Sequence, residues 1–405
     1  MSRTVGADLP QNARTPFVLQ GAVARAGLAV PLLIAWRNLV NDRARLIVTL
    51  IGIVFSVVLV GMQIGLLLNF ISTTSMMVDR SGADILITAP GVRSFDISTP
   101  QSERRRYEAL AVPGVASAEV VIIDFSPWKR ADGVRELVML VGVAPNATMG
   151  LPWNLAGGAS AQTLLAQPDG VIIDRLYAEK LGVSRLYQVN EINDIRVRVV
   201  GFTERIRTFT QSPFVFTSLE NARRIMGRGD KHISYVLVRA AAGHDLEDVR
   251  RRLQERMPDT QAIAAADFAR NSSHYWLFST GAGISLIMSA VLGLSIGGVV
   301  VAQTLYASTM DRLPEYAMLR AIGGTAEYLY LIVLLQAGLA GVIGYAIGLA
   351  MTAAIVSLSS DASAAPEMPP WLAVAIGVAT LADCLLAAAV SLRVVMGVDP
   401  VKAFR

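Results

Sequence analysis

The stretch Ala307–Glu327 reads ASTMDRLPEYAMLRAIGGTAE, and it is a polar segment enclosed by long apolar runs. The runs that flank it are Leu277–Tyr306 and Tyr328–Leu358, and a third follows at Trp371–Leu392. A fourth run, Leu46–Phe70, stands far upstream. Each run reaches the roughly 20 apolar residues that a helix needs to cross a bilayer. The sequence therefore predicts an α-helical membrane protein with four transmembrane helices, one before and three after a large polar segment.

The composition agrees with a membrane protein that carries a soluble part. The chain has 405 residues, of which 53% are hydrophobic and 17% are charged, whereas a soluble domain is about 25% charged. The basic residues are spread along the chain and the net charge is only +4, so we predict no nucleic-acid partner. The single cysteine, Cys384, lies inside an apolar run, which argues against a disulfide framework or a zinc site.

The residues before the first span predict two short segments. We expect residues 1–30 to form a flexible tail. Residues 31–45 predict an interfacial helix, because Pro31 suits a first helical turn and several apolar side chains fall on one face. A plain linker is the alternative. The run 46–70 is longer than the about 7–15 apolar residues of a signal peptide and no A-x-A site follows it, so we expect it to remain as a membrane anchor.

The segment 71–276 alternates predicted strands with predicted helices. The strands are Ala83–Ala89, Ala118–Asp124, Leu137–Val143, Gly170–Asp174, Ile195–Phe202, Phe214–Phe216, Ser234–Arg239 and Thr260–Ala264. The helices are Glu103–Leu110, Leu219–Met226 and Leu246–Met257. Two βαβ-like units thus flank a β-rich insert, and this order predicts an α+β domain whose sheet is packed by helices.

Short-loop charges predict the orientation. Basic residues lie just before the first span and just after the last span: Arg37, Arg43, Arg45, Arg393, Lys402 and Arg405. The loop 359–370 has acidic residues and no Lys or Arg. By the positive-inside rule, both termini and the loop 307–327 are cytoplasmic, including the tail 393–405, while the domain 71–276 and the loop 359–370 lie outside. Aromatic residues such as Trp276 stand at the span ends, as interfacial anchors do.

No catalytic or nucleotide-binding motif is present in the sequence. It contains no G-x-x-x-x-G-K-[ST], G-x-S-x-G, H-E-x-x-H or EF-hand pattern. The three histidines, His232, His244 and His274, are isolated, and an isolated histidine is a poor candidate for a ligand or a catalyst. We therefore predict no enzymatic activity, no cofactor and no metal in this chain.

Two features inside the spans leave alternatives open. Asp383 is an ionisable residue deep in the last span, where such a residue is costly and often functional. It predicts either a structural polar contact, with Gln63, Gln303 or Gln336 as possible partners, or a role in motion or substrate passage. The pair Gly344-x-x-x-Gly348 allows close helix approach, and it predicts either packing within one chain or a homodimer face.

The loop between the second and third spans predicts a short amphipathic helix. Pro314 suits its first turn and Gly323 its end. The alternative is a plain connecting helix. The charged residues of this loop are Asp311, Arg312, Glu315 and Arg320, and apolar side chains between them are Tyr316, Met318 and Leu319.

This loop resembles the cytoplasmic loop of the permease subunits of type VII ABC transporters, the FtsX/MacB superfamily. The family pattern R-x-x-E-x-x-x-L-R-A-x-G is matched from Arg312 to Gly323. The stretch Ala35–Leu39 and the chain end Asp399–Arg405 are also similar to the family. The resemblance extends from about Pro31 and is greatest to the DevC-type exporters without a fused ATPase. Two positions depart from the pattern, Pro314 in the loop and Gln336, where the family often has a glutamate.

The resemblance implies a membrane subunit that works with other chains. Such a permease forms a homodimer in the lipid of the bacterial inner membrane, and a separate cytoplasmic ATPase binds the ATP. Its MacB-like core domain would be 71–276 and its FtsX-like permease domain 277–400. The implied contacts with the ATPase are Asp311, Arg312, Glu315, Tyr316, Leu319, Arg320 and Gly323.

The resemblance also implies a mechanism and its partners. ATP hydrolysis would move the periplasmic domain and drive export, together with a membrane-fusion adaptor and an outer-membrane channel. Two other functions stay open: a lipoprotein-releasing permease, and an FtsX-like activator of a periplasmic cell-wall hydrolase. The cargo cannot be read from the sequence.

Overall fold

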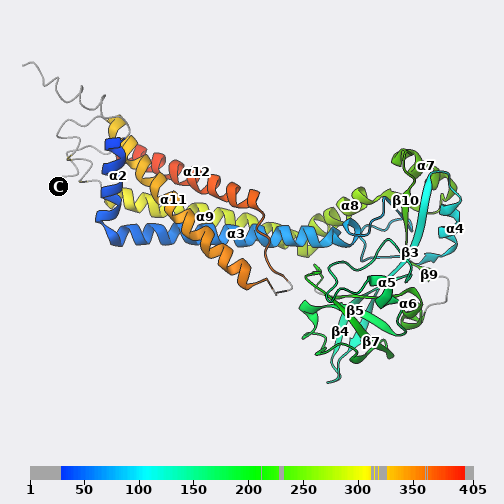
Figure 1. Cartoon of the computed structure of the whole chain (residues 1–405). Coiled ribbons are helices and arrows are strands. Elements are labelled where there is room, and N and C mark those ends of the chain that lie inside the picture. The colour runs from blue at the N-terminus through cyan, green and yellow to red at the C-terminus, as the bar shows by residue number, and fades with distance from the viewer. Residues whose placement is uncertain are drawn as a thin grey trace, which may run out of the picture. The chain divides into compact units, whose positions relative to one another are not determined.

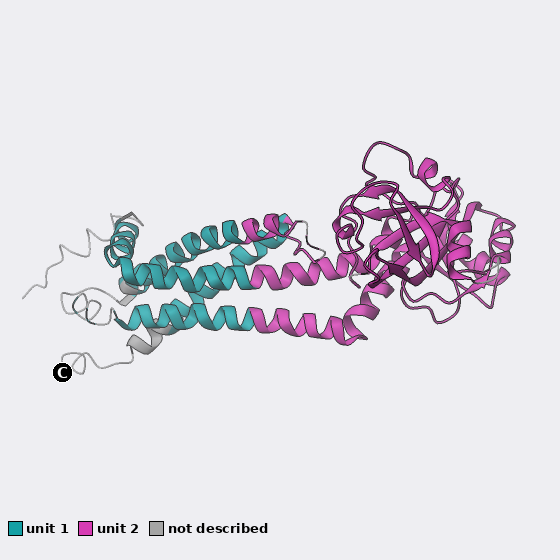
Figure 2. Cartoon of the chain, turned by 90° about the horizontal axis from the view of Figure 1, so that it is seen from below, with its two compact units in different colours: residues 1–59, 294–351, 370–405 teal, residues 60–293, 352–369 magenta. Residues whose placement is uncertain are grey.

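The computed structural model describes residues 29–210, 212–227, 232–311, 314, 318, 326–360, 362 and 364–396. Its contacts divide the chain into two compact units, coloured separately in Figure 2. Unit 1 comprises residues 1–59, 294–351 and 370–405, and unit 2 comprises residues 60–293 and 352–369. Each unit is described by itself.

Four described helices are long and apolar enough to cross a membrane. They follow the short helix α2 (Ala29–Asn41), and Figure 1 labels all five. The four are α3 (Arg43–Asp79), α9 (Gly281–Asp311), α11 (Ala326–Leu358) and α12 (Pro370–Met396). The predicted 1 + 3 layout of apolar helices is confirmed.

The first long helix differs from the predicted span 46–70 at both ends. It begins at Arg43, where the chain leaves α2, and continues past Phe70 to Asp79. The added residues, 71–79, are largely polar but contain no glycine or proline, so nothing in them breaks the helix before Gly82. The apolar run 46–70 therefore predicted the apolar part of α3 and did not predict its extension over residues 71–79.

Unit 2 contains a mixed sheet of nine strands, in the order β11-β1-β10-β3-β4-β8-β5-β7-β6. The strands are β1 (Ile85–Thr88), β3 (Val115–Lys129), β4 (Arg135–Val143), β5 (Gly170–Asp174), β6 (Val189–Ile192), β7 (Ile195–Thr203), β8 (Phe214–Ser218), β10 (Tyr235–Ala240) and β11 (Gln261–Ala264). Two parallel pairs, β4–β8 and β5–β7, stand among antiparallel pairs. A separate ladder joins β2 (Gln101–Ser102) to β9 (His232–Ile233).

One pairing closes part of this sheet into a ring. The end of β3 also pairs with β6, through Trp128 opposite Ile192 and Lys129 opposite Glu191. The strands β3, β4, β8, β5, β7 and β6 therefore form a closed barrel, with β10, β1 and β11 extending from β3 as an open sheet. The long strand β3 belongs to both parts, because its first half pairs with β10.

Short helices complete unit 2. They are α4 (Arg104–Leu110), α5 (Ala161–Leu165), α6 (Leu219–Met226), α7 (Leu246–Arg256), α8 (Ala265–Phe278) and the 3-10 turn η1 (Arg175–Tyr177). Their apolar faces pack on the sheet in three buried clusters. The predicted combination of a helix-packed sheet with a β-rich insert is confirmed.

Candidate functional site: the joint of the unit 1 helices

The helices α3 and α9 are linked where α3 begins and α9 ends. Asp42, between α2 and α3, caps α3 by accepting the backbone N–H of Arg45 at 3.3 Å. The Arg45 guanidinium lies 3.2 Å from the Asp42 carboxylate and 3.4 Å from the carboxylate of Asp311, the last residue of α9. More than a third of each of these side chains is exposed, so the pairs add little to stability. Their main effect is to connect two helix ends.

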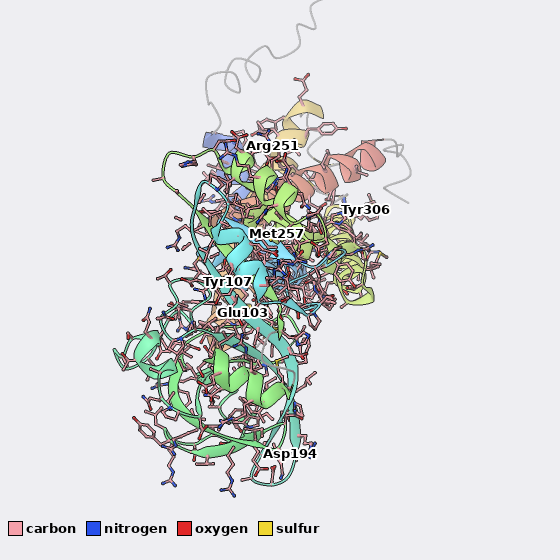
Figure 3. The ribbon with its side chains drawn as sticks, turned by 90° about the vertical axis from the view of Figure 1, so that its right-hand side faces the viewer. Glu103, Tyr107, Asp194, Arg251, Met257 and Tyr306 are labelled. Atoms are coloured by element: carbon pink, nitrogen blue, oxygen red, sulfur yellow. The ribbon has the colours of Figure 1, made fainter. Side chains whose placement is uncertain are left out.

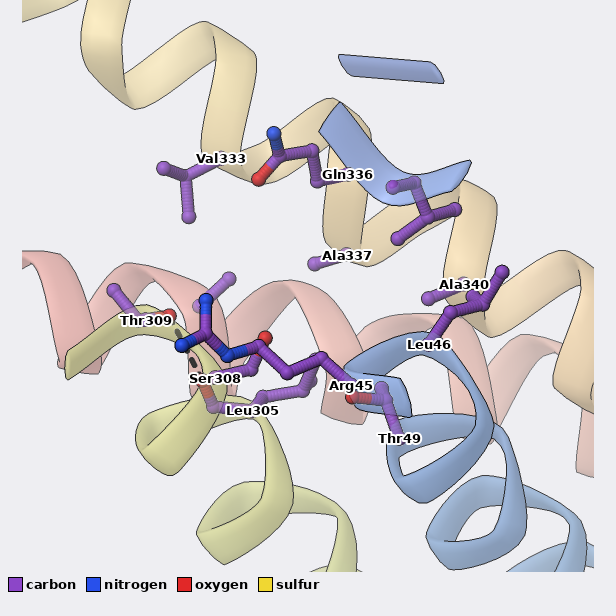
Figure 4. A pocket seen from close by; sticks show the side chains of 12 residues that line it. Arg45, Leu46, Thr49, Leu305, Ser308, Thr309, Val333, Gln336, Ala337 and Ala340 are labelled. Carbon is purple, nitrogen blue, oxygen red and sulfur yellow. Dashed lines mark hydrogen bonds between the residues drawn. The ribbon is translucent and has the colours of Figure 1, made fainter. Parts of the chain in front are cut away.

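A small cavity of about 30 Å³ lies beside Arg45 (Figure 4). Each of the five described helices of unit 1 contributes to its lining: Leu39 from α2, Arg45 from α3, Leu305 from α9, Val333 from α11 and Ala388 from α12. Thr49 and Gln336 add polar atoms to it. Such a volume holds roughly one or two water molecules, so this cavity marks the place where the helices meet.

Glycines let α3 approach α9 and α11 closely. A Cβ at Gly52 of α3 would lie 2.8 Å from the hydroxyl of Thr304 in α9. A Cβ at Gly344 of α11 would lie 2.6 Å from the Ile53 side chain. At Gly348 the corresponding distance to the side chain of Val57, also in α3, is 2.7 Å. The Gly344-x-x-x-Gly348 pair thus packs within one chain, as one of its two interpretations predicted.

Of the predicted coupling residues, Asp311 lies in the described part and reaches Arg45. The others fall outside the described residues: Arg312, Glu315, Tyr316, Leu319, Arg320 and Gly323. The sequence interpretation used Arg45 as an orientation charge and as part of the family-like entry pattern, and it missed Arg45 as the partner of Asp311. The family-like pattern around Ala35–Leu39 continues to this arginine, and it is the feature of the sequence that could have identified it.

The three polar residues predicted inside the spans have different surroundings. Asp383 of α12 is half-buried beside Gly298 of α9, where a Cβ would lie 3.6 Å from the aspartate Oδ2. Gln336 of α11 lines the cavity near Arg45. Gln63 lies in the part of α3 that belongs to unit 2. Gln336 and Asp383 therefore face different neighbours.

Within unit 2, the segment 359–369 is fastened to α3. The Ser72 hydroxyl donates a 2.5 Å hydrogen bond to the carboxylate of Glu367. The Glu367 backbone N–H donates to the carbonyl of Gly65 at 3.0 Å. A Cβ at Gly65 would come within 2.9 Å of the Glu367 carbonyl, so glycine permits this approach.

The helix α8 is fastened to the sheet by a buried polar cluster. The Trp276 indole N–H donates to the hydroxyl of Ser94 at 2.8 Å and to the carboxylate of Asp96 at 3.1 Å. The Tyr235 hydroxyl donates to the backbone carbonyl of Phe95 at 2.9 Å. Burial raises the pKa of the Asp96 carboxyl, although the hydrogen bonds that this carboxylate accepts from Ser94 and Trp276 oppose the shift. Trp276, predicted as an interfacial anchor, thus has a specific partner within unit 2.

The site consists of contacts between helices in the part of the chain that the structure describes. No group of three or more His, Cys, Asp or Glu side chains there is placed to hold a metal ion. What it does contain is helix ends joined by ion pairs and by glycine contacts.

Two family profiles match the chain. That of the MacB-like periplasmic core domain matches residues 46–256, more than half of the chain. That of the FtsX-like permease C-terminal matches residues 287–400.

The chain is also similar to curated relatives and, in part, to a solved structure. An uncharacterized ABC transporter permease of Mycobacterium tuberculosis strain H37Rv, Rv0072, is 25% identical over 383 residues, covering 92% of this chain and 99% of the relative. Another from the same strain, Rv2563, is 24% identical over 384 residues, with the same coverage. The periplasmic region of MacB from Actinobacillus actinomycetemcomitans aligns with a TM-score of 0.37 at 11% identity, over 47% of this chain and 92% of that one. By its profiles, the chain belongs to the MacB/FtsX family of ABC transporter permeases.

Proposed function

We propose that this chain is the membrane subunit of an ABC-type exporter in which a separate ATPase binds the segment 307–327. ATP hydrolysis in that partner would move the helices of unit 1, and the helices would drive motions of unit 2. The observation that carries the proposal is the joint at the base of this segment. There Asp311 of α9 pairs with Arg45 of α3, beside a cavity lined by the five described helices of the unit.

The helices of this joint are suited to transmit a displacement. A shift of the α9 end would act on α3 through the Arg45–Asp311 pair, and α11 would follow α3 because Gly344 and Gly348 bring their backbones close. The helix α3 is unbroken over 37 residues, which corresponds to roughly 55 Å at 1.5 Å per residue. It includes residues of both units, so a motion at Arg45 has a continuous helical path to Asp79.

In the proposal, both termini face the cytoplasm and unit 2 acts on cargo outside the inner membrane. Two copies of the chain would assemble in the lipid with two ATPase subunits, a membrane-fusion adaptor and an outer-membrane channel.

The docking segment can be tested by replacing Glu315 and Arg320 together with alanine. We expect the purified double variant to lose binding of the cognate P-loop ATPase, and the ATPase to lose its stimulation by the membrane subunit. The matched control replaces Glu255 and Arg256 together with alanine, which removes one acidic and one basic exposed side chain from α7, outside the segment 307–327. Binding and stimulation that survive in the double variant would refute the docking site.

A further inference from the structure

The loop that leaves the barrel after β7 places alternate residues inward and outward. Residues 204–210 follow β7, and β8 begins at Phe214. Ile206 and Thr208 are buried, at 1% and 3% exposure, whereas Arg207 and Phe209 between and after them are only half-buried. Inward and outward residues therefore face two different sets of partners within unit 2.

The inward residues fix the loop to the barrel. The carboxylate of Asp174, at the end of β5, accepts the Ile206 backbone N–H and the Thr203 hydroxyl, both at 2.8 Å. The Thr208 backbone N–H donates to the hydroxyl of Tyr177 at 3.2 Å. Asp174 and Tyr177 are themselves buried, so the base of the loop moves with the barrel strands.

Arg207 reaches the segment that follows α11. Its guanidinium donates to the backbone carbonyl of Ser360 at 2.7 Å and to that of Ala362 at 3.3 Å. These carbonyls lie just beyond Leu358, the last residue of α11. A helix C-terminus carries partial negative charge and unsatisfied carbonyls, so a cation is favoured there.

Phe209 contacts two other helices. Its ring centroid lies 4.6 Å from that of Trp276 in α8 and 5.8 Å from that of Phe70 in α3. Both separations are in the range of favourable aromatic pairs. Two neighbouring outward residues thus contact the segment after α11 and the helices α8 and α3.

We infer that loop 204–210 is the coupling element between the barrel and the helices that lead to the membrane, with Arg207 and Phe209 as its positioning residues. The inference rests on the proposed function, because it assumes that the helices move during the ATP cycle. It assigns a route for that motion: α3, α8 and the segment after α11 act on the loop, and the buried anchors Asp174 and Tyr177 pass the displacement to β5, η1 and β7.

The test measures a distance inside unit 2 during the ATP cycle. The full-length chain, in a Cys384→Ala background, carries cysteines at Arg80, just after α3, and at Asp194, at the β6–β7 turn of the barrel (Figure 3). Donor and acceptor dyes are attached, and the chain is assembled in lipid nanodiscs with its cognate ATPase. Energy transfer is then compared without nucleotide and with ATP plus vanadate.

We expect the unsubstituted loop to show a nucleotide-dependent change in energy transfer. Arg207→Ala and Phe209→Ala should each lose at least half of this change while ATP hydrolysis stays within about twofold. If Arg207 and Phe209 only stabilised the fold, their variants would unfold at a lower temperature and would keep the nucleotide-dependent change in energy transfer. Arg207→Lys keeps the charge without the planar fork, and it replaces Arg207→Ala if that variant does not fold. The control Arg256→Ala, at an exposed arginine of α7 outside the proposed route, should keep the full change.

Two negative results have different meanings. If the unsubstituted loop shows no nucleotide-dependent change, the proposed function itself is wrong. If the unsubstituted loop shows the change and folded Arg207 and Phe209 variants show it equally, the loop is not the coupling element and the proposed function stands.

Discussion

At the scale of single residues, Asp96 combines two roles that oppose each other. Its carboxylate accepts the indole N–H of Trp276, which fastens α8 to the sheet. It is also 92% buried, since 8% of the residue is exposed, and burial raises its pKa above the ordinary 3.8. The carboxyl group therefore binds its proton more tightly in the folded state than in the unfolded state.

This shift predicts how stability depends on pH. Because the folded-state pKa is raised, the protonated carboxyl contributes stability below pH 3.8, and this contribution is lost as pH rises through the folded-state pKa. Asp96→Asn keeps an oxygen for Trp276 and cannot ionise. We expect the variant to be more stable than the wild type at neutral pH, with the difference shrinking towards pH 3.8 and below.

The measurement is thermal unfolding of the full chain in detergent across this pH range, wild type against variant. Burial also raises the pKa of Asp174, but that carboxyl is present in both proteins and cancels in the comparison. A constant difference at all pH values would contradict the argument. Each pKa unit between folded and unfolded states corresponds to about 1.4 kcal/mol.

At the scale of elements, the glycines of α11 meet different surroundings along one helix. A Cβ at Gly344 would meet two Ile53 side-chain atoms, at 2.6 and 2.8 Å, whereas one at Gly338 has nothing within 4 Å. Ile53 is fully buried and β-branched, so it has little freedom to turn away. The two positions therefore form a matched pair for testing how tightly α11 packs on α3.

We expect Gly344→Ala to destabilise the helix packing by about 1–3 kcal/mol, the usual cost of overfilling a packed core. Gly338→Ala should be neutral or stabilising by up to about 1 kcal/mol, because alanine favours a helix over glycine. Thermal unfolding in detergent micelles compares the two. Equal effects of both substitutions would show that the α3–α11 contact is not a tight one.

Local features of the sequence account for most of the elements that could be predicted. Long apolar runs identify the spans. The strand β1 falls within the predicted strand Ala83–Ala89, and β10 overlaps the predicted strand Ser234–Arg239 and ends one residue later. The contacts that position the elements are not local. Ser72 and Glu367 are 295 residues apart in the chain. Single polar residues such as Ser72 and Asp96 form no sequence pattern from which their hydrogen-bond partners could be predicted.

At the scale of the whole molecule, the ring closure of the barrel was also beyond prediction. It depends on Trp128 and Ile192 meeting across β3 and β6, and both residues suit many apolar contacts. Only one residue of the ion pair at the candidate site was predicted as a site residue. The loop pattern indicated Asp311, whereas its partner Arg45 emerged from the geometry.

The predicted orientation assigns unit 2 to the outside of the membrane. A reporter fused at Glu220, which lies in the first turn of α6, should be active only in its extracytoplasmic form. A reporter in the segment 312–325 should show the opposite behaviour. Cytoplasmic activity at Glu220 would overturn the orientation and, with it, the proposed route of coupling.

The position of β1 has a consequence for the order of assembly during synthesis. This strand is made first, yet it pairs with β10 on one side and β11 on the other, through Ile85 opposite Val238 and opposite Ala264. Its apolar sequence ILIT therefore remains unpaired until nearly the whole domain has been synthesised. Non-local pairing of this kind folds slowly and leaves strand edges open. The nascent domain is consequently most prone to aggregation before residue 264 is synthesised. Shielding of β1 during that interval would determine the yield of folded protein.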